Sequence, residues 1–448
     1  MTVSLYFLIG FLIILFEYSR KKSYSYDTTF FFNVYFFICY CIVPICIFFG
    51  GSDYLDNKLY KSLDYFYKSY VAWYCLLALV SFFCGYFIFG NIYFKRNTSL
   101  SFKLKFTERH IIYFLFFNIS FLIFIIYLYS SQFGGLIDSI ILAKSIRNGE
   151  FVGNKFSFLK RFFSLSLISL YFSYTFLVTS PSPSRRKVFK FIFLLSIALV
   201  ICVGLLNASR GFIIISLLGI YFIKCLQDKK IYFTQLAISG LFGMFIIYMG
   251  NALLLSLPKL IAADWPTFLN SVDYYMSHNS RNIFMSILSN FSHPVMSIGV
   301  AHESVFSSNE SIRFFSDFVY AIFSLVPSFL LNIQTPETIA YLNTYNHLGV
   351  YESIIPPGLV AFGLYSFGPP GIVIYGLFLG ASSATLNRFF GGILSHSKNA
   401  SVFVYVFSYS FGLFVFNSEP RVMLQSIFTY ILVLLLFIPF FKIVRVKI

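Results

Sequence analysis

The chain has 448 residues, of which 58% are hydrophobic and only 11% are charged. A soluble domain carries about 25% charged residues, so this composition and a mean hydropathy of +0.79 exclude a soluble globular protein. A formal net charge of +16 can indicate nucleic-acid binding, but here the basic residues flank apolar runs, as they do beside membrane spans. The sequence therefore predicts an all-α polytopic integral membrane protein, 1–448 as one domain, with membrane lipids and no nucleic acid as partners.

The apolar runs predict about eleven transmembrane helices, because a span needs about 20 mostly apolar residues. The first run is followed, not preceded, by Arg20, Lys21 and Lys22, which favours a span over a signal peptide. Two further apolar patches, 283–300 and 314–331, would allow up to 13 spans. The predicted spans are 2–17, 30–50, 70–93, 111–130, 162–180, 188–206, 211–227, 231–256, 359–387 (with a possible break), 400–416 and 423–442.

Loop charges predict the orientation. The loops after the first, third, fifth, seventh and ninth spans, and the C-terminus, are all basic and short. By the positive-inside rule these segments are cytoplasmic, so the N-terminus is outside and the C-terminus is in the cytoplasm. The segment 257–358 then forms one large loop on the outer side.

Four arginines lie on this predicted outer side, against the positive-inside rule. Arg210 stands between two apolar runs, where an unpaired cation costs about 3 kcal/mol or more. Each arginine taken alone could extend to lipid headgroups. As a set facing one cavity, however, their guanidinium groups would suit the oxygens of a lipid diphosphate. The four predicted diphosphate ligands are Arg210, Arg281, Arg313 and Arg421.

A polar stretch in 341–355 supplies the candidate catalytic groups. We predict that His347 takes the proton from a sugar hydroxyl, because the free pKa of histidine is near neutral, with Glu352 beside it. His278 is the alternative base, and Tyr345 and Asn346 are predicted to bind substrate. A structural or solvated role remains the alternative for each histidine. The sequence has no zinc-type His spacing, no P-loop and no nucleophile elbow, so it predicts no metal and no cofactor.

Two Pro-Pro-Gly breaks follow this polar stretch, at 356–358 and 369–371. They are consistent with a kinked packing helix. They are also consistent with a half-helix whose N-terminal amides face an anion. The Gly376/Gly380 spacing is a common helix-packing device and indicates no chemistry.

The stretch IPPGLVAFGLYSFGPPG at 355–371, with SRG at 209–211, resembles the O-antigen and oligosaccharide repeat-unit polymerase family. Phe362 and Gly363 stand where the family pattern has an acidic residue, a role that Glu352 could take over. Arg210 matches the family's arginine at the outer membrane edge. The positions that match the family motif are Ile355, Pro356, Pro357, Leu359, Val360, Tyr365, Phe367, Gly368 and Gly371.

The resemblance implies a lipid-linked glycosyltransferase architecture (GT-C-like) in a bacterial inner membrane, with 257–358 as a large periplasmic loop. Undecaprenyl-diphosphate-linked repeat units would be polymerised into O-antigen or capsular polysaccharide without a metal. A sugar hydroxyl would attack the anomeric carbon, and undecaprenyl diphosphate would leave. A chain-length regulator and a flippase are implied partners. The alternatives are an O-antigen ligase and a polysaccharide flippase or other transporter, in which an outer loop as long as 257–358 is unusual.

Overall fold

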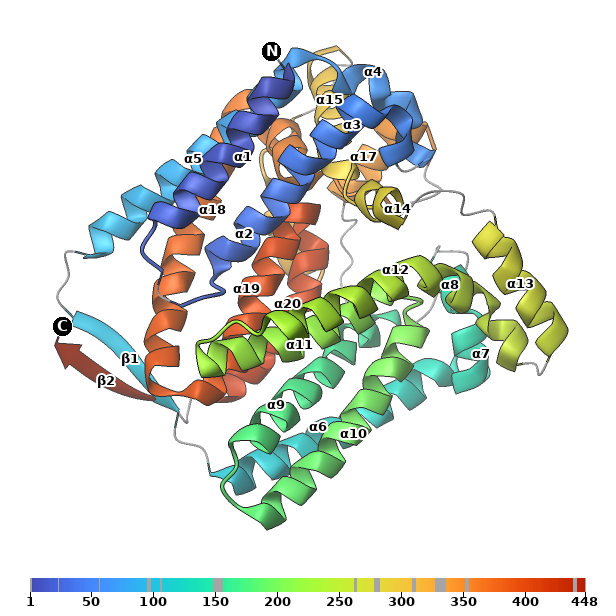
Figure 1. The fold of residues 1–448 in the computed structure, drawn as a ribbon, viewed down its shortest axis with the longest axis vertical. Helices are drawn as coiled ribbons and strands as arrows, with labels where there is room; N and C mark the ends of the chain where they lie inside the picture. The colour runs from blue at the N-terminus through green and yellow to red at the C-terminus, as the bar shows by residue number, and fades with distance from the viewer. Residues whose placement is uncertain are drawn as a thin grey trace.

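The computed structural model describes residues 2–22, 24–55, 57–94, 98–104, 107–147, 156–261, 264–277, 283–307, 312–326, 336–350, 354–437 and 441–447. Within these ranges the chain is α-helical apart from one two-stranded sheet (Figure 1). The long helices are α1 (Thr2–Ser19), α5 (Ser69–Phe94), α6 (Glu108–Ser131), α9 (Leu165–Thr179), α10 (Pro183–Leu206), α11 (Arg210–Asp228), α12 (Phe233–Ile261), α18 (Gly358–His396), α19 (Ser401–Asn417) and α20 (Pro420–Phe437).

One further long rod is composite, and the remaining elements are short. The rod joins α2 (Thr28–Phe37), a π-helical turn (Ile38–Ile42) and α3 (Val43–Gly50). The short elements are α4 (Leu63–Phe66), α7 (Leu136–Ile141), α8 (Ala143–Arg147), α13 (Trp265–Ser277), α14 (Ile283–Ser289), α15 (His293–Ser307), α16 (Ser316–Phe323) and α17 (Ile339–Leu348), with the strands β1 (Thr98–Leu104) and β2 (Phe441–Lys447).

Ten helices among the described residues are long and apolar enough to cross a membrane. They correspond to ten of the eleven predicted spans, so the prediction of a multi-pass helical membrane protein is confirmed. The remaining predicted span, 231–256, falls in α12. The apolar helical stretch described there, Phe233–Ile246, is shorter than a typical span. The patches 283–300 and 314–331 form no extra spans in their described parts, because α14, α15 and α16 have 7, 15 and 8 residues.

The small sheet bears on whether α12 crosses the membrane. β1 and β2 pair antiparallel, with Thr98 opposite Lys447 and Leu104 opposite Phe441. Paired strands lie on the same side of a bilayer, so an even number of crossings must separate them. The long helices between them are α6, α9, α10, α11, α12, α18, α19 and α20, which makes eight only if α12 is counted. The pairing therefore favours α12 as an eleventh crossing.

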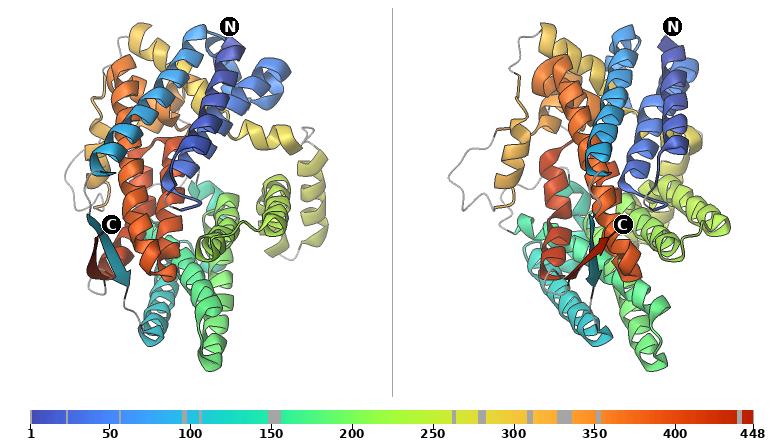
Figure 2. Two further views of the ribbon diagram at one scale, coloured as in Figure 1. Left: turned by 60° about the vertical axis from the view of Figure 1, so that its left-hand side comes forward. Right: turned by 90° about the vertical axis from the view of Figure 1, so that its left-hand side faces the viewer.

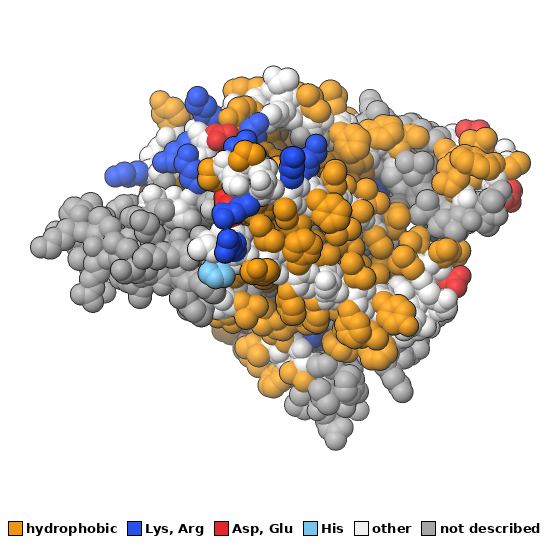
Figure 3. Space-filling model, turned by 90° about the horizontal axis from the view of Figure 1, so that it is seen from below, with side chains coloured by type: hydrophobic (Ala, Val, Ile, Leu, Met, Phe, Trp, Pro, Cys, Tyr) orange, Lys and Arg blue, Asp and Glu red, His pale blue; other side chains and the backbone are white. Residues whose placement is uncertain are grey.

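The outer surface of the helices is apolar, as a lipid-facing surface must be. Figure 3 shows a broad hydrophobic face with Lys and Arg side chains gathered toward one end. Phe117 on α6 and Phe191 on α10, for example, are 68% and 60% exposed. Aromatic side chains at such positions need a lipid environment rather than water.

Glycines let α5 and α18 approach closely. A β-carbon on Gly380 would lie 2.1 Å from the carbonyl oxygen of Phe82, and one on Gly85 would lie 2.2 Å from that of Leu377. Gly376 likewise faces Ser81 on α5. The interpretation of the Gly376/Gly380 spacing as a packing device is therefore confirmed.

The helix α18 is broken where the sequence predicts a break. Phe367 has φ −157° and ψ 24°, and Gly368 has φ 65°, a left-handed conformation that favours glycine. The half-helix before the break is buried, since the side chains from Leu359 to Ser366 are at most 2% exposed. Protein therefore covers the half-helix, whereas Phe367 at the break is 42% exposed.

Candidate functional site

The second Pro-Pro pair creates a docking place for the outer segment. In an unbroken helix the N–H groups of residues 369 and 370 would donate to the carbonyls of Tyr365 and Ser366, but proline has no N–H. These two carbonyls instead accept hydrogen bonds from the main-chain N–H groups of Arg313 (3.0 Å) and Phe314 (2.8 Å). The proline motif thereby fixes the chain that leads into α16.

Two of the four predicted arginines meet at one buried carboxylate. Asp317, on the first turn of α16, is 1% exposed. Arg313 donates to both of its oxygens, from Nε to Oδ2 at 2.7 Å and from Nη2 to Oδ1 at 3.0 Å. Nη2 of Arg421, on the first turn of α20, lies 3.9 Å from Oδ1. The predicted convergence of outer-side arginines therefore holds for Arg313 and Arg421.

Arg421 has unused hydrogen-bonding capacity. Its Nη2 donates to the carbonyl of Pro336 at 2.7 Å, and its guanidinium carbon lies 5.5 Å from the centre of the Tyr320 ring. Its Nε is buried and has no hydrogen-bond partner within the described ranges, and the whole residue is only 8% exposed. A buried donor without a partner is costly, which marks this guanidinium as a candidate anion ligand.

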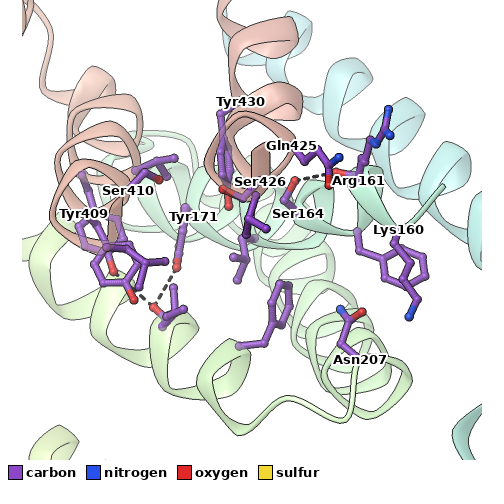
Figure 4. A pocket seen from close by; sticks show the side chains of 18 of the residues that line it. Lys160, Arg161, Ser164, Tyr171, Asn207, Tyr409, Ser410, Gln425, Ser426 and Tyr430 are labelled. Atoms are coloured by element: carbon purple, nitrogen blue, oxygen red, sulfur yellow. Dashed lines mark hydrogen bonds between the residues drawn. The ribbon is translucent and has the colours of Figure 1, made fainter. Parts of the chain in front are cut away.

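A cavity of about 570 Å³ lies next to this cluster, between α9, α11, α19, α20 and the 3₁₀ turn Ser157–Ser164 (Figure 4). The first halves of α9 and α11 contribute to its wall, together with α19 from Tyr405 to Leu413 and α20 from Val422 to Tyr430. Four tyrosines and several apolar side chains make up much of the lining, with polar side chains between them. The labelled lining residues are Lys160, Arg161, Ser164, Tyr171, Asn207, Tyr409, Ser410, Gln425, Ser426 and Tyr430.

The cluster and the cavity share one face of α20. Arg421 and Gln425 are four residues apart, and therefore one helical turn apart on the same face. Gln425 lines the cavity, and its Nε2 lies 3.4 Å from the carbonyl oxygen of Ser324, which caps α16. Arg161, on the other wall, donates from Nη1 to the carbonyl of Leu325 at 2.5 Å. The end of α16 is thus held beside the cavity, and Figure 2 (right) shows this segment beside α20.

Tyrosine hydroxyls join three helices at the cavity wall. Tyr171 of α9 and Tyr405 of α19 both donate to the carbonyl of Ile215 on α11, at 2.9 and 3.4 Å, and all three residues line the cavity. Rigid aromatic walls with a few polar groups are typical of a site for a small or amphipathic ligand.

Of the other two predicted arginine ligands, the structure describes Arg210 only and places it against α12. Arg210 begins α11, but its side-chain carbons lie against Gly250 of α12, where a β-carbon would be 2.5 Å from Cδ of Arg210. The cavity is lined instead by Phe212 and Ile215 of the same helix. Arg281 lies outside the described residues, as do His278 and Glu352.

The predicted base, His347, is buried in a hydrogen-bond network. Its Nδ1 lies 2.6 Å from Oγ of Ser62, and its Nε2 lies 3.2 Å from Oγ of Ser297. Asn343 donates to the same Ser297 and to the carbonyl of Ile355, each at 2.9 Å. The network fastens α17 to the chain that enters the half-helix of α18, which is the structural alternative considered for this histidine.

The protonation of His347 also favours a structural role. Burial, together with a smaller effect of nearby His293, lowers its pKa to about 3. The side chain is therefore neutral near pH 7, and a base with so low a pKa has little driving force to take a proton. A substrate hydroxyl would in addition have to displace one of the two serines.

Replacing His347 with glutamine tests this role. An amide can keep one hydrogen bond to a serine, so we expect stability to fall by about 1–3 kcal/mol and the glycan chain extension implied by the family resemblance to continue. Thermal unfolding and the length of the surface glycan would measure the two effects. A folded variant with no chain extension would instead support His347 as the base.

The two predicted substrate-binding residues have different surroundings. Tyr345 is 45% exposed at the surface of α17. Asn346 donates to Oγ of Ser304 at 3.1 Å and to the hydroxyl of Tyr365 at 3.3 Å. Asn346 thus belongs to the network around α17, whereas Tyr345 lies at the surface of that helix.

The position where the family pattern has an acid is filled by core. Phe362 is 0% exposed, and its ring lies 4.9 Å from that of Tyr375. Gly363 is in contact with Gly371 across the break. Neither position has room for a solvated carboxylate.

Sequence reasoning missed Asp317 and Glu419, which lie in the arginine cluster, and Lys160 and Arg161, which lie at the cavity. In the predicted orientation Lys160 and Arg161 lie on the outer side of the membrane, as the four arginines do. This departure from the positive-inside rule is a signal by which the sequence could have indicated them. No comparable signal marks Asp317, whose partner Arg421 lies more than a hundred positions along the chain.

The fold and the site define a multi-pass helical membrane protein with a buried charge cluster beside a tyrosine-lined cavity. Comparison with family models, with curated proteins and with solved structures finds no match to this chain.

Proposed function

We propose that this protein polymerises oligosaccharide repeat units carried on undecaprenyl diphosphate, at the periplasmic face of a bacterial inner membrane. The observation that supports this proposal most is Arg421, a buried cation beside the cavity. Its Nε has no hydrogen-bond partner among the described residues. In this proposal the cavity end of α20 faces the periplasm, the N-terminus is periplasmic and the C-terminus is cytoplasmic.

The position of Arg421 supports an anionic ligand. It stands on the first turn of α20, where the helix dipole disfavours a cation and favours an anion. Its nearest carboxylate, Asp317, is already taken by two shorter bonds from Arg313. A diphosphate would supply the missing acceptor for Nε and complete the charge balance of this helix end.

In this proposal the site contributes to the reaction mainly by electrostatic stabilisation. A hydroxyl oxygen of the acceptor sugar forms a bond to the anomeric carbon of the donor, and the bond from that carbon to the diphosphate oxygen breaks. The hydroxyl proton passes to a base, and the diphosphate leaves with the electron pair. Arg421 holds the charge that develops on the leaving oxygen, which is the kind of stabilisation that contributes most in many enzymes.

Tyr171 and Tyr405 join α9 and α19 to α11 at the cavity wall by bonding to Ile215. This joined wall supports an enzyme over a flippase, because a transporter needs a path that opens to each side in turn around its substrate site. The O-antigen ligase alternative shares the chemistry of the polymerase, and it is separated from the polymerase by its product.

Deletion of the gene tests the proposal. Surface polysaccharide from the deletion strain is resolved on a gel by chain length. Loss of a polymerase leaves lipid core that carries one repeat unit, and re-expression restores the ladder. Core with no repeat unit would instead identify a ligase, and an unchanged ladder would reject both functions.

A further inference from the structure

The turn between α19 and α20 buries a carboxyl group that the proposed reaction does not use. Ser418 ends α19 with φ 46°, a left-handed conformation that reverses the chain direction. Glu419 follows and is 6% exposed. Its carbonyl accepts the main-chain N–H of Met423 at 3.0 Å, so Glu419 occupies the N-terminal cap of α20, two residues before Arg421.

We propose that Glu419 binds a proton when an anion binds at Arg421 and releases that proton when the anion leaves. The identity of the anion, a lipid-linked diphosphate, rests on the proposed function. The coupling between the two groups rests on the charge cluster itself.

The charges of the cluster require such a coupling. Arg313 and Arg421 contribute two positive charges, and Asp317 contributes one negative charge. With Glu419 ionised the cluster is neutral, and an incoming anion meets no net attraction. With Glu419 protonated the cluster carries one positive charge, so less of the charge of an anion at Arg421 is left uncompensated inside a buried region, where uncompensated charge is costly.

Every element packed around Glu419 contributes to this balance. The pKa of Glu419 is raised to about 7, mainly by burial and also by Asp317, against the lowering effects of the Thr338 hydroxyl and Arg421. An anion at Arg421 would raise it again, because it repels the carboxylate and occupies the nearest cation. The charged or titratable groups of the surrounding elements are Arg313 before α16, Asp317 and Tyr320 on α16, the exposed Glu337 before α17, and Arg421 on α20.

The direction of the pH dependence follows from this. Below about pH 7 Glu419 is already protonated, so an anion binds without taking up a proton and binds most tightly. Above about pH 7 the site must first take a proton from solution, and affinity falls with each further step in pH. Over about three pH units centred near 7, we expect affinity to fall about tenfold.

Binding of inorganic sulfate to the full-length protein in lipid nanodiscs tests the proposal. The charge of sulfate is constant from about pH 5.5 to about pH 8.5, so any pH dependence belongs to the protein. Calorimetry in two buffers of different ionisation heat gives both the affinity and the protons taken up. We expect tighter binding at the acidic end and uptake of up to one proton per sulfate in the upper half of the range.

Variants separate Glu419 from other groups. Glu419→Gln mimics the protonated form, so it should bind sulfate at all pH values with the affinity of the wild type at acidic pH, and without proton uptake. Glu337→Gln, at an exposed neighbour, should behave as the wild type, and Arg421→Ala should lose binding. Absence of sulfate binding, pH-independent binding by the wild type, or unchanged proton uptake in Glu419→Gln would each overturn the coupling.

The two proposals can fail separately. Proton-linked sulfate binding together with an unchanged polysaccharide ladder in the deletion strain would reject the polymerase function and keep the coupled anion site. Loss of the ladder together with pH-independent, Arg421-dependent binding would keep the polymerase and reject the role of Glu419.

Discussion

Replacing Arg421 with alanine is expected to abolish glycan chain extension while the protein still folds. Asp317 keeps its two bonds to Arg313, at 2.7 and 3.0 Å, so this buried carboxylate stays paired. What is lost is the buried cation at the start of α20 that would hold the leaving diphosphate. Loss of one such group lowers a rate by about 10²-fold to 10³-fold. The rate of polymer formation in isolated membranes measures the effect.

Two further variants make this test specific. Arg421→Lys keeps the charge but loses the planar fork of donors, so we expect partial activity. Arg185→Ala removes an arginine at the opposite end of the helices, where its side chain is 40% exposed and paired with Glu108. It should leave the rate unchanged. A full-length ladder from Arg421→Ala would remove Arg421 from the site and with it the main support for the proposed function.

The sequence predicts the helices of this protein well, because a bilayer imposes a length and an apolar composition on each one. It also predicts the break in α18, since Pro369 and Pro370 cannot donate to the preceding turn. It cannot identify what replaces those donors. The N–H groups of Arg313 and Phe314 that do so come from a separate segment more than fifty positions earlier, and no local pattern encodes that pairing.

The candidate site is less predictable than the helices for the same reason. Arg313 and Arg421 each stand out in the sequence because they lie on the predicted outer side of the membrane, where arginine is uncommon. Their meeting at Asp317 depends on how α16 packs against α20. His347 has the residue type and the sequence neighbours of a catalytic base. Its burial between Ser62 and Ser297 is a tertiary property, and burial decides its pKa. The charge of each side chain can be read from the sequence, whereas tertiary packing determines its partner and its burial.

Replacing Gly371 with alanine is expected to prevent stable folding, because the two halves of α18 touch at this residue. A β-carbon there would lie 2.1 Å from the carbonyl oxygen of Gly363 and 3.1 Å from Cβ of Phe367. Main-chain atoms cannot move aside, so the buried half-helix would have to separate from the rest of α18, at a cost of about 3 kcal/mol. The yield and thermal unfolding of the solubilised protein measure this cost.

The matched control for this variant is Gly240→Ala in α12, where a β-carbon would have no atom within 4 Å. Alanine there should be neutral or slightly stabilising, because it forms helix more readily than glycine. If Gly371→Ala instead folds with normal yield and stability, the two halves of α18 cannot be in contact. The carbonyls of Tyr365 and Ser366 would then lie elsewhere, and the docking of Arg313 that brings Asp317 to Arg421 would have to be revised with them. The stability of one glycine variant therefore tests the geometry on which the anion site depends.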